Sequence, residues 1–123
     1  MWLNKNEEKT FGPFLVYVHE HENDIFIFSY NDGTELEVTL YLYEYESDNG
    51  LDIHDKEYEE YWELAFEITK VIKDDRNLYS IKDKVLVNYH TIPMKYNVAS
   101  VGNWFRDNKA TYLLKYKINH FSF

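Results

Sequence analysis

Two short clusters of histidines and carboxylates are the residues best suited to bind a metal ion. The segment 19–22, His-Glu-His-Glu, would project both imidazoles from one face of a β-strand. A zinc-protease helix needs His-Glu-x-x-His, and Asn23 stands where the second histidine would be. Asp52, His54 and Asp55 form the second cluster, which lacks the pattern of a calcium loop. Neither cluster predicts a metal site, and we expect no metal and no cofactor.

Asn88 and His90 are the best candidates for acid–base chemistry, because they share one side of a predicted strand near its end. A general base needs a carboxylate partner, and the sequence offers several without a means of choosing among them. No glycine-rich phosphate loop, nucleophile elbow or cysteine is present. We therefore predict no catalytic residues and favour a protein that is not an enzyme. The alternative is a small hydrolase or metal-dependent enzyme that uses His90 or the Asp52 cluster.

Size and composition indicate one globular domain, residues 1–123. The chain has 45% apolar and 19% aromatic residues, which excludes disorder caused by low hydrophobicity. It contains no cysteine, so a disulfide framework and a thiolate zinc site are excluded. The first residues lack the apolar stretch of a signal peptide, and charges interrupt every candidate membrane span. We expect a cytoplasmic protein.

The chain is strongly acidic. It has 22 acidic and 13 basic residues, a formal net charge of −9. This charge repels nucleic acid and anionic lipid, so neither is an expected partner. A large charged partner should be a basic protein, unless the charge serves only solubility.

Three strands are predicted in the first half of the chain. Phe14 to His19 and Ile25 to Tyr30 are short β-branched and aromatic runs, which predict a hairpin across the polar stretch Glu20 to Asp24. Leu36 to Tyr45 alternates aliphatic and polar or tyrosine side chains, as expected of a third strand.

The segment Lys56 to Lys73 admits two interpretations. Trp62, Leu64 and Phe66 alternate as in a strand, but the apolar residues also fall on one broad arc of a helix. The helix additionally explains a stripe of acidic residues on its opposite side, formed by Glu59, Glu60, Glu63 and Glu67. Asp55 would cap its N-terminus. We therefore predict an amphipathic helix here.

Further strands are predicted at Lys84 to His90, near Tyr96 to Ser100, and at Ala110 to His120. The fold class expected is α+β, with an antiparallel or mixed sheet of about five to six strands and one amphipathic helix packed on a face. If the predicted helix is instead a strand, a small all-β barrel is the alternative.

Two groups of residues predict a surface that binds a partner. The glutamates of the stripe would repel one another at helical spacing, and binding of a basic partner would explain why they are placed together. A glutamate face exposed to solvent is the simpler interpretation. Tyrosine is enriched at interfaces, although a tyrosine face can also be buried under a helix. The expected partner-binding residues are Glu59, Glu60, Glu63, Glu67, Tyr41, Tyr43 and Tyr45.

These features favour a non-enzymatic, acidic protein-binding module. Its most concrete form is an immunity or antitoxin-type inhibitor that covers the basic active site of a partner such as a nuclease. Besides the enzyme, the alternatives are a small-ligand carrier with aromatics around a cavity, and a homodimer that shares an aromatic face.

Overall fold

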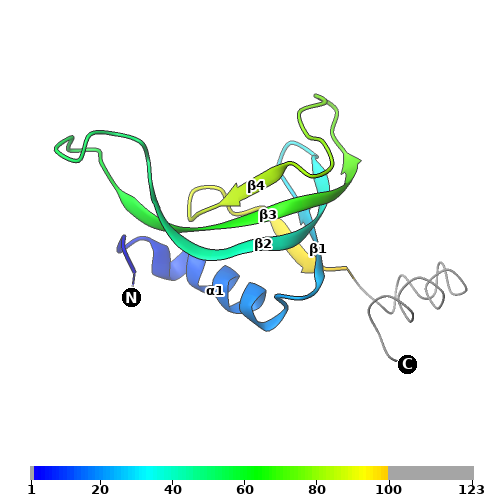
Figure 1. The fold of residues 1–123 in the computed structure, drawn as a ribbon, viewed down its shortest axis with the longest axis horizontal. Helices are drawn as coiled ribbons and strands as arrows, with labels where there is room; N and C mark the ends of the chain where they lie inside the picture. Colours follow the sequence, from blue (N-terminus) through cyan, green and yellow to red (C-terminus); the bar gives the residue numbers. More distant parts are fainter. Residues whose placement is uncertain (1, 100–123) are drawn as a thin grey trace, which may run out of the picture.

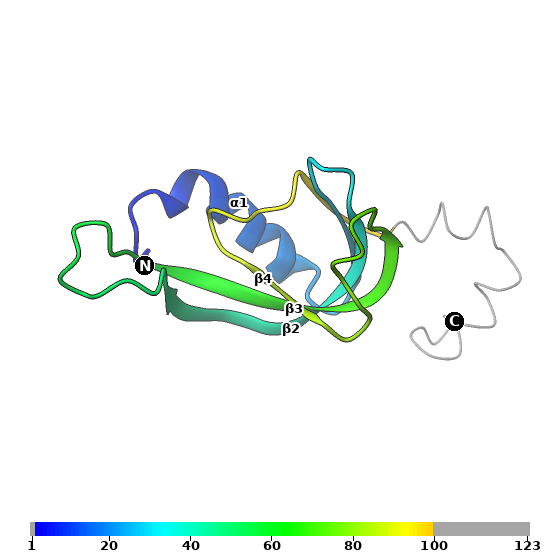
Figure 2. The ribbon, with the colours of Figure 1, turned by 90° about the horizontal axis from the view of Figure 1, so that it is seen from above.

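The computed structural model describes residues 2–99, which form one helix and five strands (Figure 1). The elements are α1 (Glu7–Glu20), β1 (Ile25–Ser29), β2 (Glu35–Asp48), β3 (Glu60–Lys73), β4 (Lys84–Val87) and β5 (Lys95–Val98). The strands form an antiparallel sheet in the order β4-β3-β2-β1-β5. The helix packs against one face of this open sheet (Figures 1 and 2). The predicted α+β class is confirmed, and the sheet is not closed into a barrel.

Helix α1 begins earlier than any element that we predicted and replaces the predicted first strand. Its buried side chains Phe11, Phe14, Leu15 and Val18 recur at the spacing of one helical face. The prediction of a strand from Phe14 to His19, and of a hairpin with the next strand, is therefore wrong. Pro13 inside the helix removes one backbone hydrogen bond, which costs about 3 kcal/mol. Burial of each large apolar side chain contributes roughly 1.5–3 kcal/mol, so the four together outweigh that cost.

Strand β3 occupies the segment for which we predicted a helix, and that prediction is also wrong. Trp62, Leu64, Phe66 and Ile68 alternate toward the core, as the strand interpretation required. Asp55 caps no helix, because its carboxylate accepts the backbone N–H of Glu57 in the loop between β2 and β3. Strands β2 and β4 pair with β3 on its two sides, and the spacing of apolar residues in the sequence could not reveal this backbone pairing.

The other strand predictions within the described residues are confirmed with shorter or longer limits. Strand β1 matches the prediction from Ile25 to Tyr30, and β2 extends the prediction from Leu36 to Tyr45 at both ends. Strand β4 covers only the first half of the predicted Lys84 to His90, because Asn88 to Thr91 form a turn. Strand β5 matches the strand predicted near Tyr96 to Ser100. The strand predicted at residues 110–120 lies outside the described residues.

An aromatic cluster joins the helix to the sheet. The ring of Phe66 in β3 lies 6.1 Å from Phe14, 5.8 Å from Phe26 and 4.8 Å from Phe28, measured between ring centres. All four side chains are fully buried. Within residues 2–99, no helix is long and apolar enough to cross a membrane.

This packing yields a stability prediction. We expect Phe14→Ala to lower the free energy of unfolding by about 3–5 kcal/mol, because it removes a buried ring and leaves a cavity between α1 and the sheet. Val16→Ala is the matched control, since Val16 is on the same helix but 58% exposed. Urea denaturation followed by tryptophan fluorescence measures both, and equal losses in the two variants would contradict the packing.

Candidate protein-interaction site

The four glutamates of the predicted stripe do not share one surface. Glu60 is exposed and accepts a hydrogen bond from the hydroxyl of Tyr58, at 3.0 Å. Glu67 is half-buried and forms an ion pair with Lys84 across β3 and β4, at 3.4 Å. Glu59 and Glu63 belong to two polar clusters nearer the start of β3. Glu63 and Glu67 share the face of the sheet that α1 does not cover, but each of the four glutamates has different partners, so they do not form the continuous stripe that was predicted.

Glu63 is a buried carboxylate whose partners are neutral. It is only 6% exposed, and it lies on the face of the sheet that α1 does not cover. The hydroxyl of Tyr45 donates to it at 2.9 Å, and the amide of Asn88 donates at 3.0 Å. Burial, and then this hydrogen bond to Glu63, raises the pKa of Tyr45 to about 12. These contacts give Glu63 a role in joining β2, β3 and the turn after β4.

Glu59 is paired with His90, the histidine considered above as a general base. The same carboxylate accepts hydrogen bonds from the hydroxyl of Tyr89, at 2.7 Å, and from the side-chain amide of Asn4, at 3.1 Å. Burial raises the pKa of Glu59, but hydrogen bonds from His90 and Tyr89 outweigh it, so the pKa is below its usual range. This cluster ties the segment before α1 to the turn after β4.

The two sequence clusters considered as metal ligands are dispersed among turns and exposed positions. Among residues 2–99, no group of three histidine, aspartate or glutamate side chains is arranged to hold a metal ion. His21 contacts Asp24 at 3.0 Å, just after α1. The Asp52 carboxylate accepts the backbone N–H of His54 at 2.8 Å within an exposed loop, as Asp55 does for Glu57. These carboxylates shape the loop between β2 and β3.

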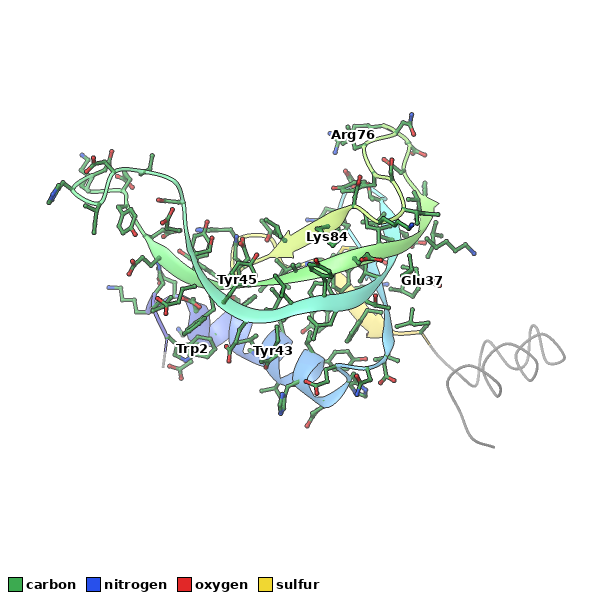
Figure 3. All side chains as sticks on the ribbon, in the orientation of Figure 1. Trp2, Glu37, Tyr43, Tyr45, Arg76 and Lys84 are labelled. Carbon is green, nitrogen blue, oxygen red and sulfur yellow. The ribbon has the colours of Figure 1, made fainter. Side chains whose placement is uncertain are left out.

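The three tyrosines of β2 point to different sides of the sheet. Irregular pairing with β3 between Leu40 and Tyr45 breaks the simple alternation. The ring of Tyr41 lies 4.5 Å from the Lys84 ammonium, so Tyr41 belongs to the uncovered face with Tyr45. Tyr43 instead points toward α1 (Figure 3), and its ring centre lies 5.8 Å from that of His19. The sequence could not reveal this break, because it depends on the register with β3.

A groove of about 890 Å³ runs between α1 and the second half of β2. Trp2 and Tyr43 lie on the α1 side of β2 (Figure 3), and the Trp2 ring lies against Gly12. Val16, which is 58% exposed, projects from α1 into the same groove. The lining residues are Trp2, Glu8, Gly12, Pro13, Leu15, Val16, Tyr17, His19, Glu20, Tyr43 and Glu44. Of the seven residues predicted to bind a partner, this groove contains only Tyr43.

The groove is apolar along its floor and acidic at its rim. Glu8, Glu20 and Glu44 are exposed lining residues, and no lysine or arginine of residues 2–99 lines the groove. Burial raises the pKa of Tyr43, and the nearby charges of Glu44 and Glu22 raise it further. The prediction of a strand at Phe14 to His19 concealed this site, because it assigned the wrong neighbours to Val16. The helical spacing from Phe11 to Val18 was the signal that could have revealed it.

The Glu63 contacts can be tested by removing a single hydroxyl. We expect Tyr45→Phe to lower the free energy of unfolding by about 1–3 kcal/mol, because a buried carboxylate loses one of its two donors. Tyr41→Phe is the control, since Tyr41 is 55% exposed and its ring contact with Lys84 needs no hydroxyl. Chemical denaturation should show a change below about 0.5 kcal/mol for the control. Equal effects would mean that the hydrogen bond to Glu63 adds nothing to stability.

The lowered pKa of Glu59 predicts a pH-dependent contribution to stability. A carboxyl with a lower pKa in the folded state stabilises the fold above its unfolded pKa of about 4.3, and this contribution is lost as the pH falls through the folded pKa. The urea midpoint of Glu59→Gln should therefore lie below wild type at about pH 5, and the gap should narrow as the pH is lowered further. Glu57→Gln, at an exposed loop position, should follow wild type throughout. A constant gap between Glu59→Gln and wild type would contradict the lowered pKa.

Comparison with known proteins identifies the family. Residues 10–92 match the family described as "Cognate immunity protein YxxD". This range includes most of α1, strands β1 to β4, and all the groove-lining residues except Trp2 and Glu8. Neither the curated proteins nor the solved structures contain a match to this chain. Because the match spans more than half of the 123 residues, the chain belongs to the YxxD family of cognate immunity proteins.

Proposed function

We propose that this protein neutralises a cognate toxin by binding it directly, and that the toxin presents a basic surface. Membership of the immunity-protein family is the observation that carries this proposal. An immunity protein of this kind acts by recognition, so the features that matter are its surface shape and charge.

The charge distribution supports a basic partner. A formal net charge of −9 speeds encounter with a positively charged surface and repels competing anions. The groove has the same sign of charge, because its described lining residues include three carboxylates and no lysine or arginine. A toxin whose active site binds phosphate groups, such as a nuclease, has the complementary charge.

The internal contacts of the polar residues support binding in preference to catalysis. Glu59 holds His90, Tyr89 and Asn4 together, while Glu63 joins Tyr45 to Asn88. Both clusters link separate elements of the fold, and none of these residues lines the groove. The groups best suited to acid–base chemistry thus have structural partners of their own.

Growth rescue and binding test this function. The cognate toxin should stop growth when produced alone, and co-production of this protein should restore growth. The purified pair should form a complex whose association rate is at least about tenfold faster at low than at high ionic strength. Rescue without a complex would overturn direct binding. A complex whose association is insensitive to salt would overturn the basic partner while leaving neutralisation intact.

A further inference from the structure

We infer that the groove between α1 and β2 is the surface that holds the toxin, and that the toxin fills it with an extended, lysine- or arginine-containing segment added to the sheet as a strand beside β2. This inference rests on the proposed function and adds to it the site and the mode of binding. It follows from three properties of the second half of β2: an unpaired edge, an apolar neighbour and a uniform sign of charge.

The edge of β2 from Leu40 to Asp48 has no strand beside it among the described residues. Strand β1 pairs with β2 only from Glu35 to Thr39, whereas β3 pairs with β2 as far as Asp48. Figure 2 shows this part of β2 at the outer border of the sheet. In an antiparallel ladder, successive residues direct their backbone N–H and C=O groups to alternate sides. About half of the residues from Leu40 to Asp48 therefore present hydrogen-bonding groups to an incoming strand.

The groove provides a place for the side chains of such a strand. Alternate side chains of an added strand would point toward α1, where Val16, Pro13 and Tyr43 form an apolar floor and Trp2 is a further aromatic lining residue. Recognition by strand addition combines backbone hydrogen bonds at the edge with pockets for alternate side chains. Both parts lie side by side here, because residues of α1 and of β2 line the same groove.

The charge of the edge favours a basic segment over a second copy of this chain. From residue 40 to residue 47, β2 contains Glu44 and Glu46 and no lysine or arginine. Glu8 and Glu20 add carboxylates from α1. Two copies paired along this edge would bring these acids together, which is unfavourable. A lysine or arginine would pair with the carboxylates and could also stack on the ring of Tyr43.

The opposite face of the sheet exposes apolar side chains, but no helix among the described residues packs on it to form a groove. Tyr41, Leu42 and Leu86 are each at least 50% exposed there, in the strands on either side of β3. Lys84 adds a positive charge, 4.5 Å from the ring of Tyr41. This face therefore lacks the groove and the uniform negative charge on which the inference depends, and it supplies matched controls.

Charge and size substitutions in the groove test the site. Against the toxin identified by growth rescue, we expect Val16→Arg to raise the Kd at least about 100-fold and Glu44→Lys at least about tenfold. The controls Leu86→Arg and Glu60→Lys make the same changes outside the groove, and each should stay within about threefold of wild type. All four residues are exposed, so the variants should fold, which urea denaturation verifies.

Hydrogen exchange tests the mode of binding. On binding the toxin, alternate backbone amides between residues 40 and 47 should become at least about 100-fold more protected, while those of the β4 edge, Lys84–Val87, should not change. The inference is wrong if the wild-type protein binds the toxin and restores growth, but Val16→Arg and Glu44→Lys change the Kd no more than the control variants do and the amides of residues 40–47 gain no protection. It is also wrong if the amides are already protected in the free protein, because the edge is then occupied by this chain or a second copy. Failure of rescue would instead overturn the proposed function.

Discussion

Burial of the aromatic cluster between α1 and the sheet is the constraint on which the rest of the structure depends. Phe14 packs against Phe28 and Phe66 from the sheet and lies 4.8 Å from the ring of Tyr96 in β5. One helix has one apolar stripe, so it covers only one face of the sheet. The long strands β2 and β3 extend beyond the short pairing with β1, and α1 lines a groove with the part of β2 that has no partner on this side among residues 2–99. The groove is thus a consequence of how the core is built.

A buried carboxylate fixes where the helix begins. Glu7 is fully buried, and it accepts the backbone N–H of Asn4 at 3.0 Å and that of Trp62 at 3.2 Å. The first contact closes the turn before α1, and the second ties that turn to β3. Trp2 precedes this turn, so the same bonds constrain one part of the groove lining. The stability of the fold and the proposed recognition surface therefore depend on the same contacts around the N-terminus of α1.

The sequence predicted an element correctly where its local residue pattern favoured the same structure as its contacts in the folded protein, and it failed where the two disagreed. The strands β1 and β2 were predicted correctly because their apolar residues lie on a sheet face with strong β propensity. Helix α1 was missed because Gly12 and Pro13 resemble a break, while its four-residue buried stripe outweighs that local preference. Strand β3 was mistaken for a helix because Glu63 had no visible reason to lie in a sheet, and Tyr45 and Asn88 supply that reason only in three dimensions. The family-level function was predicted from charge and composition, but of the predicted contact residues only Tyr43 lies in the groove.

The carboxylates along the free edge of β2 reconcile two demands that usually conflict. An unpaired strand edge invites pairing with any exposed strand, including that of an identical chain, and proteins commonly prevent this with charged side chains. Glu44 and Glu46 oppose self-pairing by repulsion, because an identical edge carries the same charges. The same charges would attract the basic segment that we propose, so one set of side chains would both discourage self-pairing and favour the proposed partner. Lysines at these positions would protect the edge equally well, but they would repel such a basic segment.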